Sequence, residues 1–404
     1  MSAEMLTLKV ESPLALHRRR ASEQFAPTLD YVPGSAVRGA LADLYLAGVP
    51  ERAREKAFLE LFLSESVCFS DFLPVPSGDK GLAYLLPVTA MACKRFADHE
   101  SASLTDALLR LELAREMERP DALELGTWAY CSECQSQDRK GKRDRTEPGY
   151  YASLEGFKRV SVRRRMIAGA AIERVTGTAA HAMLFSHEVI EESDVNEKVL
   201  FRGVVNLPDG LRSQLLELAQ PRQRLAVGYG RSRGLGQVSV EGWDTPPVQR
   251  QTLAERWTAL NQAARDLWKS FDLQPQGQYF TLTLQSHLAL KNAVGEPILG
   301  DVTAADLGLP TEATRCRSVL SAVIVSGWNA ALNLPKPDAW ALGRGSVLLF
   351  RLPAGADPKP AMEQLEKIER EGVGERRAEG LGRMCACDAF HFYFLQRELK
   401  GGSR

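Results

Sequence analysis

The sequence predicts an α+β protein built from two related units, each of which combines a small sheet with helices. Residues 6–16 alternate apolar and polar side chains, and residues 36–47 then form a helical pattern. A strand followed by a helix opens a ferredoxin-like βαββαβ unit, the RRM-like topology. A glycine-rich loop at residues 228–238 recurs about 145 residues later at residues 372–384. We therefore expect tandem ferredoxin-like units.

The remaining elements follow from periodicity and glycine or proline signals. We expect helices over residues 51–63, 104–117, 211–219, 253–271 and 359–370. Strands are expected over residues 160–172, 180–191, 198–205, 222–227, 279–290, 317–325, 346–352 and 385–395. Residues 49–157 are too long for one connection and are interpreted as an insertion. The predicted domains are residues 1–245, a helical linker 246–276, and residues 277–404. Trp328 and Trp340 are expected to be core residues.

The first glycine loop (residues 228–238) contains Gly228, Gly230, Gly234 and Gly236 between two strand-like segments. Glycine costs backbone entropy and offers nothing to pack, so this is neither a helix interior nor a well-packed strand. Bare backbone amides beside Arg231 and Arg233 suit a phosphate. The alternative is a wide hairpin turn with solvated arginines. The second glycine loop (residues 372–384) carries acidic residues at 375 and 379, which favours a structural or protein-contact role there.

Two motifs together resemble the RAMP superfamily of CRISPR–Cas proteins. One is Gly-x-Gly-x-x-x-Gly-Leu-Gly in the first glycine loop, and the other is Tyr-Val-Pro-Gly-Ser-Ala-Val-Arg-Gly-Ala-Leu at residues 31–41. Gly-Ala-Leu-Ala at residues 39–42, Cys-Lys-Arg at 93–95 and Cys-x-x-Cys at 131–134 are most similar to the RAMP subunit of type III-D effector complexes. The resemblance spans most of the chain and is thinnest between residues 244 and 277.

Composition limits the class of protein and its partners. The chain has 404 residues, 44% hydrophobic and 25% charged, as in a soluble globular protein. Its net charge is zero, so nucleic-acid binding requires local patches. Residues 138–165 hold ten Lys or Arg against four acids, and residues 17–20 read His-Arg-Arg-Arg. Either patch is a binding surface or a solvated face. Seven cysteines and no secretory signal predict a cytoplasmic protein without membrane association.

The cysteines predict one structural zinc ion, in a zinc-knuckle-like insertion. Cys131 and Cys134 stand three positions apart, which lets two thiolates grip one tetrahedral ion. Cys93 is the third candidate because the type III-D resemblance includes a cysteine there. His99 or Cys68 is the fourth. The alternative is a set of buried thiols without metal.

Two residues are candidates for RNA cleavage. His17 ends the first strand beside three arginines and could serve as a general base, or it is a solvated turn residue. Asp30 lies near the entry to the first helix, where an acidic residue of related backbone subunits cuts target RNA. It is otherwise a turn or capping residue.

The resemblance implies a non-catalytic subunit that binds the repeat-derived 5′ tag of the CRISPR guide RNA for antiviral defence. The implied protein partners are the large polymerase-like subunit and backbone RAMP subunits. The expected RNA-binding residues are Arg38, Gly228, Gly230, Arg231, Arg233, Gly234, Gly236, Arg376, Arg377 and Arg383. The alternatives are a RAMP endoribonuclease, acting through His17 or Asp30, and an architectural subunit.

Overall fold

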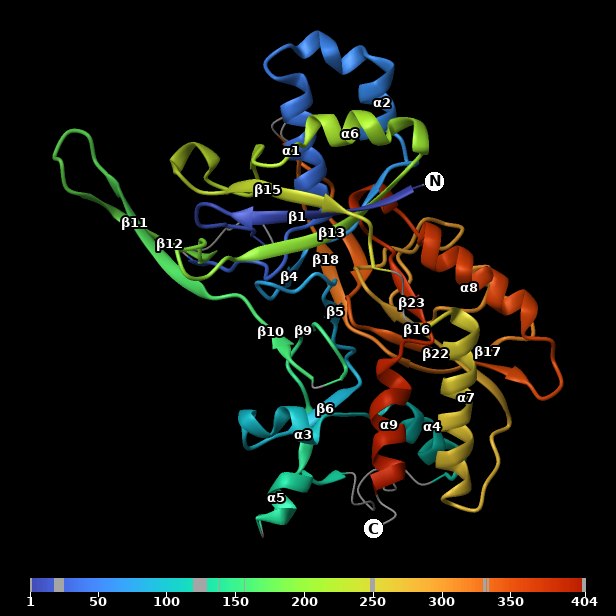
Figure 1. Ribbon diagram of the computed structural model, residues 1–404. Helices are drawn as coiled ribbons and strands as arrows, with labels where there is room; N and C mark the ends of the chain where they lie inside the picture. Colours follow the sequence, from blue (N-terminus) through green and yellow to red (C-terminus); the bar gives the residue numbers. More distant parts are fainter. Residues whose placement is uncertain are drawn as a thin grey trace.

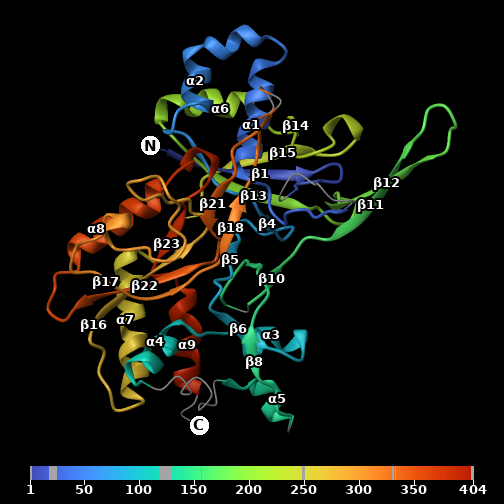
Figure 2. The ribbon, with the colours of Figure 1, turned by 180° about the vertical axis from the view of Figure 1, so that it is seen from behind.

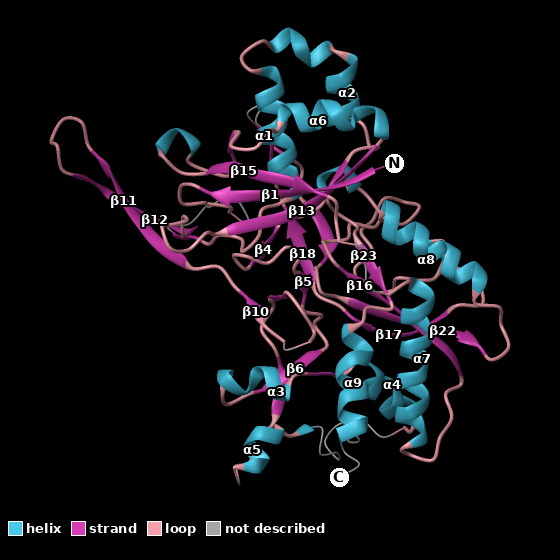
Figure 3. Cartoon of the chain, viewed as in Figure 1, coloured by secondary structure: helices cyan, strands magenta, loops and turns pink. Residues whose placement is uncertain are grey.

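The protein mixes helices and strands throughout, as predicted (Figure 3). The computed structural model describes residues 2–17, 25–118, 129–137, 139–155, 157–247, 251–329, 332 and 334–401. The arginines at 18–20, part of a predicted basic patch, lie outside the described residues. Among the described helices, none is long and apolar enough to cross a membrane.

The first sheet is antiparallel and has the order β14-β15-β1-β13-β3, with β4 also paired to β13. Its strands are β1 (Ser2–Val10), β3 (Cys68–Phe69), β4 (Leu73–Val75), β13 (Leu200–Leu207), β14 (Arg224–Ala226) and β15 (Gln237–Asp244). Helices α1 (Gly34–Leu46), α2 (Lys56–Phe62) and α6 (Arg212–Leu218) lie together above it in Figure 1. Leu8, Leu41 and Leu215 share the resulting apolar core.

Helix α1 begins at Gly34, two residues before the start of the predicted helix at residue 36. Pro33 is its N-cap and supplies no side-chain hydrogen bond. The backbone N–H of Gly34 instead donates to the Asp71 carboxylate at 3.2 Å. A distant residue therefore caps this helix, which local sequence could not indicate.

The second sheet is also antiparallel, in the order β17-β22-β16-β23. Its strands are β16 (Gly277–Leu284), β17 (Thr314–Val319), β22 (Val347–Pro353) and β23 (Met384–Ala386). Its core takes side chains from α4 (Leu108–Glu116), α7 (Leu253–Lys269), α8 (Lys359–Glu371) and α9 (Phe390–Gly401). Helix α7, expected in a linker, buries Trp257, Leu260 and Trp268 in this core.

The strand expected over residues 385–395 is wrong beyond its first two residues. The chain leaves β23, takes a positive φ of 47° at Cys387, and then forms α9. The Asp388 carboxylate accepts from the N–H of Phe390 at 3.0 Å, which starts the helix. Phe392 packs into the second core while Phe390 and Phe394 pack into another cluster. A helix buried on several sides has no clear helical pattern, so its sequence resembles a buried strand.

The predicted insertion is partly wrong, because its residues also build the main sheets. Strands β3 and β4 complete the first sheet, and α4 packs in the second core. The rest forms two three-stranded sheets, β10-β9-β5 and β7-β6-β8. Their strands are β5 (Tyr84–Leu85), β6 (Ala90–Cys93), β7 (Thr105–Asp106), β8 (Arg143–Arg145), β9 (Tyr150–Tyr151) and β10 (Arg159–Val160). The short helices beside the β7-β6-β8 sheet are η2 (Ala97–His99), α3 (Glu100–Ser103) and α5 (Ser132–Ser136), whereas η1 (Pro50–Arg54) lies beside α1 and α2.

A long hairpin, the arm, projects from the body in both Figure 1 and Figure 2. It consists of β11 (Arg164–Ile172) and β12 (Ala179–Ile190), paired antiparallel as predicted around Gly177. At the base of the arm, β12 pairs in parallel with β2 (Phe25–Ala26).

The predicted core positions of two tryptophans are wrong. Trp328 is 47% exposed and Trp340 is 51% exposed. They lie on two small hairpins outside the second sheet, where each strand pairs with only one partner. The strands are β18 (Ala322–Val325), β19 (Trp328–Asn329), β20 (Leu334–Pro335) and β21 (Ala339–Leu342).

A charged contact joins the loop before β22 to the first sheet. The Arg344 guanidinium carbon lies 3.8 Å from the centre of the Tyr31 ring and the group pairs with Asp71 at 3.7 Å. Burial raises the pKa of Asp71 to about 6, although Arg344 opposes that shift. This contact ties the loop before β22 of the second sheet to the segment before α1 and to the connection between β3 and β4 of the first sheet.

Candidate metal centre and nucleic-acid interface

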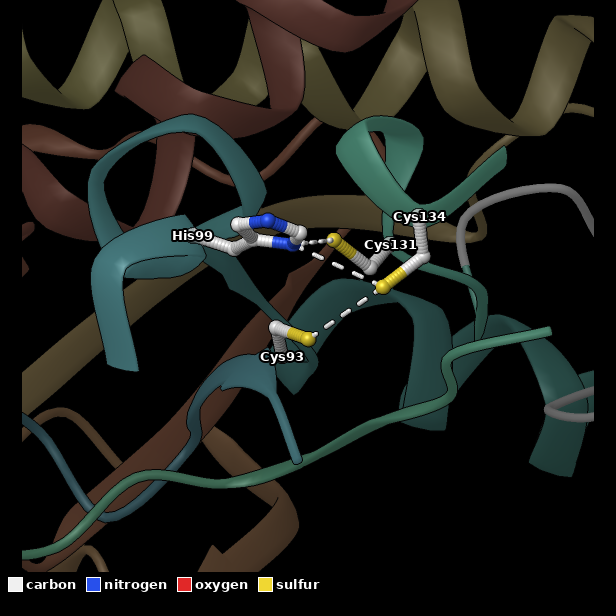
Figure 4. A group of neighbouring side chains, drawn as sticks. All are labelled: Cys93, His99, Cys131 and Cys134. Carbon is white, nitrogen blue, oxygen red and sulfur yellow. Dashed lines mark hydrogen bonds between the residues drawn. The ribbon is translucent and has the colours of Figure 1, made fainter. Parts of the chain in front are cut away.

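Four ligand-bearing side chains meet beside the small β7-β6-β8 sheet: Cys93, His99, Cys131 and Cys134. Cys93 ends β6, His99 lies in η2, and the other two cysteines stand at the start of α5 and within it. Figure 4 shows their sulfur atoms and the imidazole pointing toward one another. All four ligand atoms lie within 4.8 Å of one another.

The spacing of these atoms fits a tetrahedral metal ion. The Cys93 and Cys134 sulfurs are 3.7 Å apart, and His99 Nδ1 lies 3.5 Å from Cys134 Sγ and 3.6 Å from Cys131 Sγ. Zinc–sulfur bonds of about 2.3 Å in a tetrahedron separate two sulfurs by about 3.8 Å. A site with four protein ligands leaves no position for substrate, so a bound ion would be structural.

Neighbouring groups hold the ligands in place. Ser103 Oγ donates to the His99 carbonyl at 2.7 Å and accepts from the Cys93 N–H at 2.9 Å. A Cβ at Gly141 would lie 2.4 Å from the Cys134 sulfur, so this position requires glycine. Burial opposes ionisation of Cys93, yet backbone N–H groups of Arg95 and Phe96 lower its pKa, which favours the thiolate that binds metal.

The structure chooses between the two candidates for the fourth ligand. His99 is in the cluster, whereas Cys68 lies on β3 of the first sheet and belongs to no such group among the described residues. Spacing in the sequence could not decide this, because both residues precede the Cys-x-x-Cys pair at long distance.

The first glycine loop joins β14 to β15 and is exposed along most of its length. Its glycines Gly228, Gly230, Gly234 and Gly236 all have positive φ. A Cβ at Gly236 would lie 2.1 Å from the Val227 carbonyl oxygen, so no other residue fits. The expectation of bare amides holds only in part, because four loop N–H groups bond to backbone carbonyls. The donors are Tyr229, Arg233, Leu235 and Gly236.

The second glycine loop repeats this hydrogen-bond pattern. In the first loop, Val227 N–H donates to Gly236 O and Tyr229 N–H donates to Ala15 O. In the second loop, the equivalent bonds run from Val373 to Gly382 and from Glu375 to Ala289. Each loop also contains one turn of 3₁₀ helix, η6 (Arg231–Arg233) and η8 (Arg377–Glu379). The two loops are the same structure built twice.

Their surroundings differ. A Cβ at Gly380 would lie 2.5 Å from the Phe69 carbonyl oxygen, so the second loop packs against β3 of the first sheet. Arg376 pairs with Glu379 at 2.7 Å, and Arg377 pairs with Glu65 at 2.9 Å. Burial lowers the pKa of Arg383. These three arginines, which were predicted to bind RNA, are therefore paired with acids of the protein or buried in it.

Arg38 is in the same contact region. Its guanidinium donates to the Phe62 carbonyl, and burial lowers its pKa while nearby Glu379 acts against that shift. By contrast, Arg231 and Arg233 are exposed. Among the described residues, Arg231 has a single, long ion pair of 3.8 Å to Asp43, and Arg233 has none.

Half of the ten basic residues in the segment 138–165 form ion pairs with acids among the described residues. Arg143 pairs with Glu398 at 2.9 Å while almost buried, and Arg159 pairs with Glu100. The arginines at 163, 164 and 165 pair with Glu197, with Asp30 and Glu188, and with Glu192. Sequence reasoning counted charges along the chain and could not see these partners.

The two candidate catalytic residues have different surroundings. Asp30 accepts from the Tyr150 hydroxyl at 2.8 Å and lies 3.8 Å from Arg164, which is a structural set of partners. The His17 ring stacks on the His187 ring at 5.2 Å and lies 4.9 Å from the Tyr229 ring. Sequence reasoning missed both neighbours, since only the fold brings residues 17, 187 and 229 together.

The family match covers the part of the chain that builds most of the first sheet. Residues 7–239, more than half of the chain, match the family model described as RAMP superfamily. No curated protein matches.

Several solved structures are similar at low identity. One chain, in "Type III-B Cmr-beta bound to cognate target RNA and AMPPnP", is 12% identical with a TM-score of 0.42, covering 86% of each chain. Another, in "Csm3-Csm4 subcomplex in the type III-A CRISPR-Cas interference complex", is 11% identical with a TM-score of 0.34, covering 89% of this chain and 96% of that chain. Oligomeric Cmr4 from Pyrococcus furiosus is 12% identical with a TM-score of 0.27, covering 60% and 98%. Given the match over residues 7–239, this chain belongs to the RAMP superfamily.

Proposed function

We propose that this RAMP protein is a non-catalytic subunit of a type III CRISPR interference complex that binds the 5′ tag of the guide RNA. One observation carries the proposal. The first glycine loop presents Arg231 and Arg233 at the surface, whereas the second glycine loop packs against β3 of the first sheet. An exposed loop with two guanidinium groups at the surface, one of them held only by a long ion pair, can grip the phosphates of a single strand. The second glycine loop, with Arg376, Arg377 and Arg383, then serves to hold the two sheets together.

The fold proposal is a tandem of ferredoxin-like units, in domains 1–245 and 277–404. In chain order the first sheet uses β1, β3 with β4, β13 and β15, and in space β15, β1, β13 and β3 lie side by side. The second sheet uses β16, β17, β22 and β23 in chain order. In space they lie in the order β23, β16, β22 and β17, which matches the first sheet strand for strand. Helix α6 precedes β14 and β15 as α8 precedes β23. The repeated glycine loops support the same duplication.

The resemblance to type III-D subunits supplies the finer assignments. The partners would be the guide RNA, the large polymerase-like subunit and backbone RAMP subunits, in the cytoplasm. The Cys93, His99, Cys131 and Cys134 cluster would hold one structural zinc ion and would fix the insertion rather than take part in chemistry.

The test removes the two exposed charges. Arg231→Ala with Arg233→Ala should weaken binding of the full chain to single-stranded repeat RNA. Each lost phosphate contact should also flatten the plot of log K against log salt by about 0.7. Binding should be measured by fluorescence anisotropy across a salt series.

The matched control is Arg265→Ala with Arg370→Ala, which removes two exposed arginines from α7 and α8. An unchanged salt slope in the loop variant, or an equal loss in the control, would contradict the proposal. Guide RNA that crosslinks in the assembled complex only to neighbouring subunits would favour an architectural role.

A second candidate function is endoribonuclease activity. His17 and His187 place two imidazoles 5.2 Å apart beside the first glycine loop, and two histidines can supply a general acid and a general base. Incubation of the protein with repeat RNA and with target RNA tests it. Cleavage by the wild type that is lost in His17→Ala or Asp30→Ala would establish an enzyme and overturn the hypothesis of a non-catalytic subunit.

A further inference from the structure

Four rings form a continuous row between the arm and the first glycine loop. The ring row consists of Phe185, His187, His17 and Tyr229. Neighbouring ring centres are 5.3 Å apart for Phe185 and His187, 5.2 Å for His187 and His17, and 4.9 Å for His17 and Tyr229. Tyr229 also lies 5.2 Å from His187, which closes the row at the loop end.

Backbone pairing sets the row in place from three distant parts of the chain. Phe185 and His187 alternate along β12 and so point to the same face of the arm. His187 is opposite Ala26 of β2, and His17 forms a bridge with Thr28. The Tyr229 N–H donates to the Ala15 carbonyl at 2.9 Å, which holds the glycine loop against the segment that carries His17.

The rings are not part of a hydrophobic core. None of them belongs to the apolar clusters formed by the described residues. Tyr229 is 44% exposed, and the other three are half-buried. Phe69 and Phe72 of the same unit are fully buried by comparison. Core packing therefore does not account for a row of rings that opens to the surface at the loop.

The histidines of the row keep unused hydrogen-bonding atoms. His17 Nε2 and His187 Nδ1 are buried and have no hydrogen-bond partner within the described parts of the chain. Such atoms are unfavourable unless water or a ligand satisfies them.

The charge state of the row also suits stacking. Burial lowers the pKa of His17, with a further contribution from His187. Burial likewise lowers the pKa of His187, with a further contribution from Arg233. Near neutral pH both imidazoles are therefore uncharged flat rings, and the positive charge lies to one side on the glycine loop.

We propose that the ring row stacks against unpaired bases of a single-stranded RNA while Arg231 and Arg233 contact its phosphates. Bases that stack on aromatic side chains beside a basic backbone track are the usual mode of single-strand recognition. This inference rests on the proposed RNA-binding function and adds the residues that contact bases. Tyr229 is the principal residue, because it is exposed and lies directly within the arginine-bearing loop.

The test compares two probes on the full chain: a short single-stranded RNA, and an oligoribose-phosphate of equal length without bases. Tyr229→Ala should weaken binding of the RNA about tenfold and leave the base-free probe unchanged. Tyr229→Phe keeps the ring and should bind both probes as the wild type does. Phe271→Ala is the matched control, because Phe271 is 46% exposed but lies outside the row.

Each result decides the matter. Equal weakening of both probes would assign Tyr229 to the backbone, and no weakening of either would also overturn the stacking role. If the wild type binds neither probe, the proposed function fails together with this inference. If RNA binding depends on Arg231 and Arg233 but not on the row, only this inference fails. RNA cleavage that requires His187 would replace stacking by catalysis.

Discussion

His391 lies between a hydroxyl group and a carboxylate, the same sequence of groups as in a catalytic triad, but the arrangement is buried. Its Nε2 lies 2.8 Å from Thr283 Oγ1, and its Nδ1 lies 3.0 Å from Asp106 Oδ2. Thr283 and His391 are fully buried, and Asp106 is 3% exposed. No substrate reaches such a group, so these residues link β16, α9 and β7 as a structural unit.

The stability of the protein should depend on pH through His391. Burial alone lowers its pKa, but Asp106 outweighs burial and raises the pKa above the ordinary value of 6.5. A histidine with a raised folded-state pKa stabilises fully below its unfolded-state pKa, and the contribution is lost as pH rises through the folded-state pKa. The stability difference between wild type and His391→Gln should therefore shrink as pH rises above the ordinary histidine pKa of 6.5. Urea unfolding at several pH values measures it.

His17 provides a control of opposite sign. Burial lowers its pKa, so the corresponding difference for His17→Gln should grow as pH rises. Asp388 also faces His391, and burial raises the pKa of its carboxyl group. Because Asp388 is present in the wild type and in both variants, its own titration contributes to both proteins of each comparison. A His391 difference that stays constant or grows with pH would show that the imidazole is not held as a cation.

At the scale of elements, the β7-β6-β8 sheet is too short to hold itself together. Its strands have two to four residues each, and only a few apolar side chains from them reach a core. A metal bound by Cys93, His99, Cys131 and Cys134 would tie β6, η2 and α5 together without a larger core.

Metal analysis should find about one zinc ion per chain. Cys131→Ser with Cys134→Ser should lose the ion, lower Tm and speed proteolysis between β6 and β8, since the small sheet loses its cross-link. Chelation of the wild type should have the same effect. Cys316→Ser is the control, because this half-buried cysteine lies outside the cluster. Metal-free protein after purification without chelator would remove the zinc assignment.

At the scale of the whole molecule, one duplicated loop faces solvent and the other holds the two units together. Gly234 and Gly380 have φ of 81° and 96°, so alanine is strained at both. A Cβ at Gly380 would lie 2.5 Å from the Phe69 carbonyl oxygen, while none of the described atoms lies within 4 Å of a Cβ at Gly234.

Gly234→Ala should cost about 1 kcal/mol of unfolding free energy, from the left-handed backbone alone. Gly380→Ala should cost clearly more, because the added methyl group also separates the second loop from β3. Urea unfolding of both variants, with limited proteolysis between the sheets, measures the difference. Equal losses would mean that the second loop does not join the units.

Local pattern was enough for much of the fold. Helical periodicity predicted α1, α7 and α8 within a few residues. Alternation located β1 and β16 but placed their ends wrongly: the strands expected over residues 6–16 and 279–290 begin earlier and end at Val10 and Leu284. The arm was predicted from two strand patterns around Gly177. Errors came where local pattern does not decide burial: α9 is apolar on several sides, and Trp328 and Trp340 stay exposed on two-stranded hairpins outside the second sheet.

By itself, the sequence determined the family, the two glycine loops and the cysteine pair, because glycine at positive φ and thiolates at fixed spacing are local requirements. Only the tertiary structure decided that His99 rather than Cys68 completes the cysteine cluster. It also decided which loop keeps its arginines exposed, and it alone assembled His17, His187 and Tyr229. The groups that contact a charged side chain or an aromatic ring depend on distances in space. Those distances are fixed only when the sheets and helices pack around their cores.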